Sequence, residues 1–154
     1  MGETGTKTII ISGCGGGYDI FGALLFYFKF KSENNNNAVK FILVNYSFTK
    51  MSLLNEYSQK LTNALYRVTP TISDKYLDEN MYFPELRLAN QLNETFYAIV
   101  CNYEYTKLKF IHEVYEYIMN NESESVVDKL YLVGCGSDIL LTGNEKELGR
   151  RLNA

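Results

Sequence analysis

The sequence is poor in the residues that build disulfide frameworks and zinc sites. Its three cysteines, Cys14, Cys101 and Cys135, form no CxxC pair, and it has a single histidine, His112. An odd number of cysteines without paired spacing argues against a disulfide framework, and a zinc site would need ligands of other types. We therefore expect a reduced protein of the cytoplasm.

The sequence also lacks a basic surplus and a long apolar run. It has 15 lysines and arginines against 18 acidic residues, a formal net charge of −3, and no cluster of basic residues. Nucleic-acid binding through phosphate neutralisation needs such a cluster. The apolar run at 20–28 is too short to cross a bilayer, and the opening MGETGTK lacks the charged region and apolar core of a signal peptide. We expect neither a nucleic-acid partner nor a membrane partner.

What the sequence does contain is an alternation of strand and helix patterns. Apolar runs predict strands at 6–12, 38–46, 95–101 and 128–134, with a further extended segment at 65–72. Helix patterns lie at 20–31, 50–61 and 105–119, and from Pro84 onward. This order predicts an α/β fold with helices flanking a mostly parallel, Rossmann-like sheet, as a single domain over residues 1–154. The four asparagines at 34–37 predict a solvated loop.

The same patterns predict which sides of the elements are buried. The strands that precede the glycine-rich segments are apolar on both faces, so we expect helices on both faces of the sheet. The helix at 20–31 is apolar on nearly all sides, which predicts burial all round, and Asp19 is placed to cap its N-terminus. In the helix at 50–61 we expect Met51, Leu54 and Leu61 to point inward.

Two glycine-rich loops repeat one pattern. The strands at 6–12 and 128–134 are each followed by Gly-Cys-Gly, then by an aspartate and an isoleucine. Ligands of open α/β sheets bind beyond the carboxyl ends of the strands, so the loops would share one crevice if their strands are neighbours. The candidate ligand-binding positions are Gly13, Gly15, Gly16, Gly17, Asp19, Gly134, Gly136, Ser137, Asp138, Gly143 and Glu145.

The residue types at these loops favour a phosphate-bearing, nucleotide-like small molecule. Glycines allow backbone N–H groups to converge on an anion, and a following helix adds the positive end of its dipole. Asp19 and Asp138 could hold Mg²⁺ or accept hydrogen bonds from ribose hydroxyls. The alternative is that the glycines only permit close packing in the turns, and that each aspartate only caps a helix.

Established phosphate and nucleotide signatures fit incompletely. The dinucleotide fingerprint needs a glycine where Tyr18 stands and an acid at the end of the second strand, which ends at Asn45. No P-loop pattern with its lysine occurs. GCGGG resembles the first motif of Rossmann-like S-adenosylmethionine methyltransferases, which usually carry acids where this chain has Ile11 and Asn45. A methyltransferase-like protein is therefore the alternative reading.

A wider resemblance links five segments to an uncharacterised family, number 1152 among the domains of unknown function. The segments are SGCGGGYDIFGAL, VNYSFTKMSLL, YRVTP, YFPELRLANQL and VGCGSDILLTGNEKELG. The resemblance implies an α/β fold and a site at Gly15, Gly16, Gly17, Asp19, Gly136, Asp138, Gly143 and Glu145, without naming a reaction. Members of that family continue beyond the second glycine motif, so this chain would be a short or C-terminally truncated version. A second copy or another chain could cover the sheet edge that truncation exposes.

Three other residues offer weaker alternatives. Cys14 and Cys135 each follow a strand, where a helix N-terminus could lower a thiol pKa, although no histidine is near either in sequence. Arg67 could pair with a ligand phosphate or take part in an ordinary surface ion pair. Whether the chain is an enzyme stays open, because a non-enzymatic binding module and an inactive truncated domain fit the same pattern.

Overall fold

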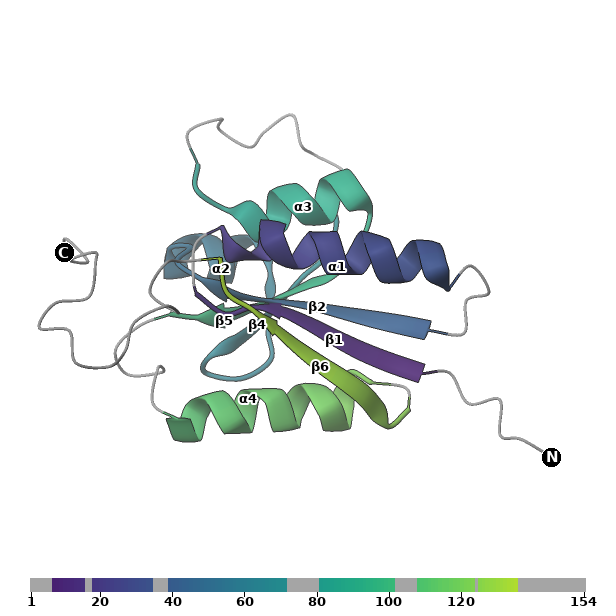
Figure 1. Cartoon of the computed structure of the whole chain (residues 1–154). Coiled ribbons are helices and arrows are strands. Elements are labelled where there is room, and N and C mark those ends of the chain that lie inside the picture. The colour runs from purple at the N-terminus through teal and green to yellow at the C-terminus, as the bar shows by residue number, and fades with distance from the viewer. Residues whose placement is uncertain are drawn as a thin grey trace, which may run out of the picture.

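The computed structural model describes residues 7–15, 18–34, 39–71, 81–101, 108–123 and 125–135. Within them the chain alternates between strands and helices (Figure 1). In order, the elements are β1 (Lys7–Gly13), α1 (Asp19–Glu33), β2 (Val39–Ser47), α2 (Met51–Tyr57), β3 (Gln59–Lys60), β4 (Leu65–Val68), α3 (Pro84–Leu92), β5 (Phe96–Val100), α4 (Leu108–Asn121) and β6 (Val127–Val133). The α/β class predicted from the sequence is confirmed. Among the described helices, none has the length and apolar character to cross a membrane.

The sheet is mixed, rather than mostly parallel as the alternation predicted. Its strand order is β3-β4-β5-β2-β1-β6; β5, β2, β1 and β6 run parallel, whereas β4 is antiparallel to both its neighbours. A tight turn makes this reversal, because Thr62 Oγ1 accepts hydrogen bonds from the N–H groups of Ala64 and Leu65, at 3.2 and 3.1 Å. The turn folds β4 back along β3, so the segment predicted only as extended runs against β5.

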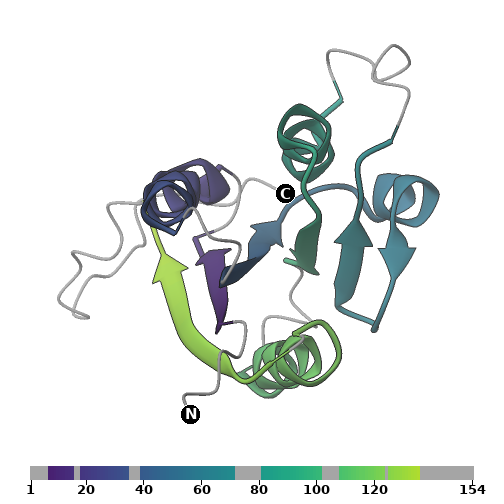
Figure 2. The same cartoon turned by 90° about the vertical axis from the view of Figure 1, so that its right-hand side faces the viewer.

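Helices cover both faces of the sheet, which gives three layers (Figure 2). α1, α2 and α3 lie over one face, where Ile11 and Leu86 belong to the larger core. α4 lies over the other face, where Ile118 packs with Ile10 in a second core. Because successive residues of β1 alternate between the two cores, this strand is buried on both faces, as predicted.

Helix α1 is buried on one side only, which corrects the prediction that it is buried all round. Its sheet-facing side chains are at most 6% exposed: Ile20, Ala23, Leu24 and Tyr27. On the outer side, Leu25 is 73% exposed, and Phe21 and Phe28 are about half exposed. The helix lies in an outer layer of the molecule, so a uniformly apolar sequence still has a sheet to pack against on one side alone.

Strand β6 is an edge strand of the described sheet and is mostly exposed, whereas the sequence predicted a buried strand. It pairs only with β1 among the described strands. Tyr131 and Val133 pack beneath α1, but Leu130 and Leu132, which point to the opposite face, are 41% and 58% exposed. Strand β6 is therefore apolar on both faces, although α1 covers only one of them and α4 does not reach the other.

The remaining elements agree with the predictions at some ends and not at others. α3 begins at Pro84, as predicted. α2 ends at Tyr57 instead of reaching Leu61, because Ser58 is extended and the chain turns directly into β3. Only Leu54 of the three residues predicted to point inward is fully buried, since Met51 is 36% exposed and Leu61 follows the helix.

Candidate functional site

The two glycine-rich loops begin at neighbouring strand ends. β1 and β6 are parallel, and Gly13 lies opposite Val133 in their register. The N–H of Cys14 donates to the backbone oxygen of Val133 at 2.9 Å, which extends the pairing past the end of β1. The motif strands are therefore neighbours, which is the condition for a shared crevice, and Gly13, Cys14, Gly15, Gly134 and Cys135 share the carboxyl edge of the sheet.

Asp19 connects the two loops instead of capping α1. The N-cap position belongs to Tyr18, and Asp19 is the first residue of the helix. Its Oδ2 accepts a hydrogen bond from the backbone N–H of Cys135 at 3.2 Å. A carboxylate is therefore held between the first turn of α1 and the start of the second loop, and the N-cap prediction for this residue is wrong.

The glycines of the first loop make room for two different neighbours. A Cβ at Gly13 would lie 2.6 Å from the backbone N of Ile20 and 2.8 Å from Asn45 Oδ1, so this glycine permits the helix to approach the strand end. A Cβ at Gly15 would lie 1.9 Å from Asp19 Oδ2. Gly13 thus fits the close-packing reading of the motif, whereas Gly15 leaves space that a carboxylate occupies.

The second loop packs against α1 as well. A Cβ at Gly22, in the second turn of the helix, would lie 2.1 Å from Cys135 Sγ. Together with the Asp19 hydrogen bond, this contact brings the end of β6 onto the same helix that follows β1. Seven predicted site positions lie outside the described residues: Gly16, Gly17, Gly136, Ser137, Asp138, Gly143 and Glu145.

Sequence reasoning missed a buried carboxylate beside the first loop. Glu85, in the first turn of α3, is fully buried. Its Oε1 accepts a hydrogen bond from Asn45 Nδ2 at 2.6 Å, and its Oε2 accepts one from the Thr49 hydroxyl at 3.0 Å. Asn45 is the register partner of Gly13, so an acid does reach the end of the second strand, carried by a helix 40 residues later. Pro84 marked the helix start, but no local signal indicated its distant partner.

The thiol of Cys14 is not activated. Its pKa is raised above the ordinary value, first by partial burial and then by the negative charge of Asp19. A raised pKa reduces the thiolate fraction at neutral pH, which is the reactive form. Two residues before Cys14, the hydroxyl of Ser12 on β1 hydrogen bonds with that of Tyr115 on α4 at 2.7 Å, and burial raises the pKa of Tyr115 to about 12. These groups stabilise the strand end and supply no base.

Arg67 lies away from the glycine-rich loops. Arg67 Nη2 contacts both carboxylate oxygens of Glu122 at 2.5 Å, and Tyr97 donates to the same carboxylate at 2.6 Å. Arg67 pairs in register with Tyr97 near the start of β5, which is the amino edge of the parallel strands. The ion-pair reading of Arg67 is therefore the one its contacts support. His112 is 76% exposed on α4, with Glu116 at 3.9 Å.

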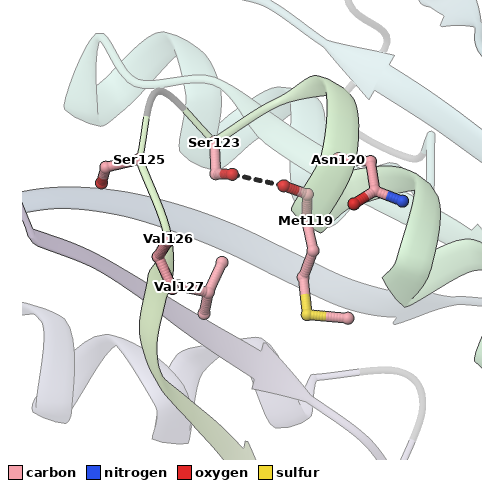
Figure 3. Close-up of a pocket in the computed structure, with 6 residues that line it drawn as sticks. All are labelled: Met119, Asn120, Ser123, Ser125, Val126 and Val127. Carbon is pink, nitrogen blue, oxygen red and sulfur yellow. Dashed lines mark hydrogen bonds between the residues drawn. The ribbon is translucent and has the colours of Figure 1, made fainter.

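A shallow pocket of about 470 Å³ opens at the end of α4 and the start of β6 (Figure 3). Its lining is Met119, Asn120, Ser123, Ser125, Val126 and Val127. The Ser123 hydroxyl donates to the backbone oxygen of Met119, and the hydroxyls of Ser125 and Thr8 hydrogen bond at 3.0 Å. No lining side chain is ionisable, and the pocket lies at the end of β6 remote from the glycine-rich loop.

No metal centre is preformed in the described part of the chain, where no three His, Cys, Asp or Glu side chains cluster. Comparison of the chain with protein-family models, with curated proteins and with solved structures found no match. The geometry at the carboxyl edge of β1 and β6 is therefore the basis for a functional hypothesis.

Proposed function

We propose that the chain is a cytoplasmic protein that binds a phosphate-bearing, nucleotide-like small molecule where the two glycine-rich loops meet. One observation carries the proposal: the Cys135 N–H already donates to a carboxylate, that of Asp19, between the two loops. An anion is thus held by a backbone donor at the start of a helix, where dipole and amide groups favour negative charge. The three cysteines, all free, are compatible with a reducing compartment.

The strand order supports this location. The series β5-β2-β1-β6 has the order of strands 3-2-1-4 in doubly wound nucleotide-binding sheets, whose ligands lie beyond the carboxyl ends of the strands where the order reverses. In this chain α1 leads from β1 toward β2, whereas β6 lies on the other side of β1. The end of β1 is therefore the reversal point, and we propose a Rossmann-like relationship on this basis. Membership of the family numbered 1152 is proposed on the sequence segments alone.

Asp19 constrains how the ligand would bind. A carboxylate repels a bare phosphate, so either Mg²⁺ lies between them or a ligand hydroxyl, such as that of a ribose, faces Asp19. Mg²⁺ binds through one or two carboxylates, phosphate oxygens and several waters, so Asp19 and Asp138 would be sufficient protein ligands. The proposal therefore predicts that phosphate binding depends on Mg²⁺ or on a sugar hydroxyl.

Thermal unfolding of the full chain tests the proposal. The ligands are ADP, ATP, sugar phosphates, acyl-CoA and S-adenosylmethionine, each with and without Mg²⁺. A ligand at a hundredfold excess over its Kd adds about 2.7 kcal/mol to the free energy of unfolding, which raises Tm by roughly 5–10 °C for a chain of this size. Asp19→Asn keeps the side-chain shape and should abolish the shift that depends on Mg²⁺ or ribose.

Asp128→Asn is the matched control, because Asp128 is an exposed acid on β6. If both variants lost the Tm shift equally, the effect of Asp19→Asn would come from the change in net charge and not from the position of Asp19. A shift with S-adenosylmethionine and none with nucleotides would favour the methyltransferase-like alternative, for which GCGGG remains the sequence feature. Ligand binding without turnover would identify a non-enzymatic module, and the absence of any shift over the whole panel would contradict the proposal.

We also propose that the chain forms homo-oligomers. α1 and β6 both expose large apolar side chains, led by Leu25 at 73% and Leu132 at 58%. Exposed apolar patches of this kind mark interaction surfaces in soluble proteins.

A further inference from the structure

The exposed side chains of α1 follow the spacing of a helix–helix seam. Tyr18, just before the first turn, and Phe21, Leu25 and Phe28 within the helix are separated by intervals of three, four and three residues. Their exposed fractions are 63%, 46%, 73% and 49%. Alternating intervals of three and four place side chains in one narrow stripe along a helix, which is the pattern of a coiled-coil contact.

This stripe is separate from the buried side of the helix. Ile20, Leu24 and Tyr27 pack on the sheet, and Phe26 stacks on Tyr131 of β6 with ring centroids 6.2 Å apart. Those contacts account for the sheet-facing and β6-facing sides of α1. The stripe is left exposed, on a helix that lies in an outer layer over the sheet (Figure 2).

We infer that a second copy of this chain packs its own α1 antiparallel against the stripe, about a two-fold axis at Leu25. In that arrangement Leu25 meets Leu25 of the partner, and Phe21 of each copy meets Phe28 of the other. Phe21, Leu25 and Phe28 are thus complementary to themselves, as an isologous two-fold interface requires. Tyr18 lies beyond this paired part, with its ring 5.5 Å from that of Tyr82 in the same chain. The inference gives the proposed homo-oligomer a surface and an orientation, and it does not depend on ligand binding.

Charge favours the antiparallel orientation over the parallel one. Lys29 is exposed and follows Leu25 by four residues, so it borders the stripe one helical turn farther along. A parallel pair would place the two Lys29 ammonium groups side by side and align the two helix dipoles, both of which are unfavourable. In the antiparallel pair the two lysines lie at opposite ends of the interface, so their repulsion is largely screened.

The area available sets the strength of the dimer. A large aromatic side chain offers about 150–250 Å², so the three half-exposed side chains of the paired part contribute roughly 300 Å² per copy. Two copies would bury about 600 Å² through them, which is below the standard 1,200–2,000 Å² of stable complexes. A weak, reversible dimer is therefore expected, with a Kd in the micromolar range or above.

Sedimentation equilibrium of the ligand-free full chain tests the inference, over concentrations of about 10 to 500 µM that bracket such a dimer. The mass should rise with concentration from 17.7 kDa toward twice that value. Leu25→Lys should lower the association constant at least tenfold, because it places two charges at the centre of the interface. The variant should fold, since Leu25 is mostly exposed and lysine is a good helix former; Phe28→Lys provides a second substitution at the same surface.

Leu132→Lys is the matched control on the exposed face of β6 and should leave the association unchanged. A wild-type chain that stays monomeric over the whole range would overturn the inference. Loss of the dimer in Leu132→Lys, with Leu25→Lys unaffected, would overturn it as well and would assign the contact to the sheet edge.

Disulfide trapping tests the orientation, in a chain whose three native cysteines are replaced by serine. For the antiparallel pair, Leu25→Cys should cross-link to itself. Phe21→Cys and Phe28→Cys should cross-link efficiently only when the two variants are mixed. Efficient self-cross-linking of Phe21→Cys would show a parallel pair and refute the arrangement.

Discussion

Adding one methyl group should destabilise the fold at Gly13 but change its stability little at Gly15, although the two glycines are two residues apart. Gly13→Ala would place its Cβ 2.6 Å from the Ile20 N and 2.9 Å from the Asp19 carbonyl carbon, both of them backbone atoms. The three atoms nearest to a Cβ in Gly15→Ala all belong to the carboxylate of Asp19, with Oδ2 at 1.9 Å. Backbone cannot yield without moving α1, whereas a side chain on the first turn can rotate.

The magnitudes follow from these contacts. Overpacking a tight site costs about 1–3 kcal/mol, and replacing glycine by alanine returns about 0.4–1 kcal/mol by restricting the unfolded chain. Gly13→Ala should therefore lose about 2 kcal/mol of unfolding free energy, near 4–8 °C in Tm. Gly15→Ala loses the Asp19–Cys135 hydrogen bond, which contributes about 1 kcal/mol to stability. The restriction of the unfolded chain by alanine offsets most of this loss. Its unfolding free energy should change by less than about 1 kcal/mol.

Urea unfolding of both variants, followed by circular dichroism, measures the difference directly. If Gly15→Ala were as destabilising as Gly13→Ala, it would be wrong that Gly13 is needed for close packing and that Gly15 leaves space for a carboxylate. The same variants separate folding from binding, because Gly15→Ala should keep the fold and lose the ligand-induced Tm shift.

Two further predictions concern buried carboxylates. For Glu122, burial raises the pKa, but hydrogen bonds from Arg67 and Tyr97 outweigh burial and lower it below the ordinary 4.5. The stabilising contribution of the Glu122 carboxylate is therefore complete above about pH 4.5 and is lost as pH falls through the lowered pKa. Glu122→Gln should lower the free energy of unfolding by about 2 kcal/mol at pH 7 and should reduce the loss of stability toward acid pH. An unchanged loss of stability toward acid pH would exclude this role of Glu122. Glu85→Ala should lower the free energy of unfolding in urea by about 3 kcal/mol, because the buried Thr49 hydroxyl and the Asn45 amide lose their shared acceptor. A loss under about 1 kcal/mol would mean that water replaces the carboxylate.

Local patterns predicted much of the fold because they report on short-range geometry. Runs such as TIII and FILV identify strands β1 and β2, and Pro84 followed by Glu85 identifies the start of α3. The repeated Gly-Cys-Gly made a shared crevice conditional on β1 and β6 being neighbours, and the structure meets that condition. The antiparallel direction of β4 was not predicted, because an extended segment has the same pattern in either direction.

The candidate site divides in the same way. The sequence located Gly13, Gly15 and Asp19 at a strand-to-helix turn, since that turn is built from consecutive residues. It could not show that Asp19 accepts a hydrogen bond from Cys135, 116 residues away, or that Glu85 reaches Asn45. Those contacts depend on how β6 and α3 dock on β1 and β2.

By itself, the sequence determined the α/β class, most of the element positions and the two glycine-rich loops, because hydrophobic period, proline and glycine act over one or two turns of chain. Only the tertiary structure decided which apolar faces are covered. Leu25 on α1 and Leu132 on β6 are as hydrophobic as their buried neighbours, and nothing in their local sequence distinguishes them. Burial is a property of what packs against a side chain, and those partners come from distant parts of the chain or, for α1, from the second copy we propose.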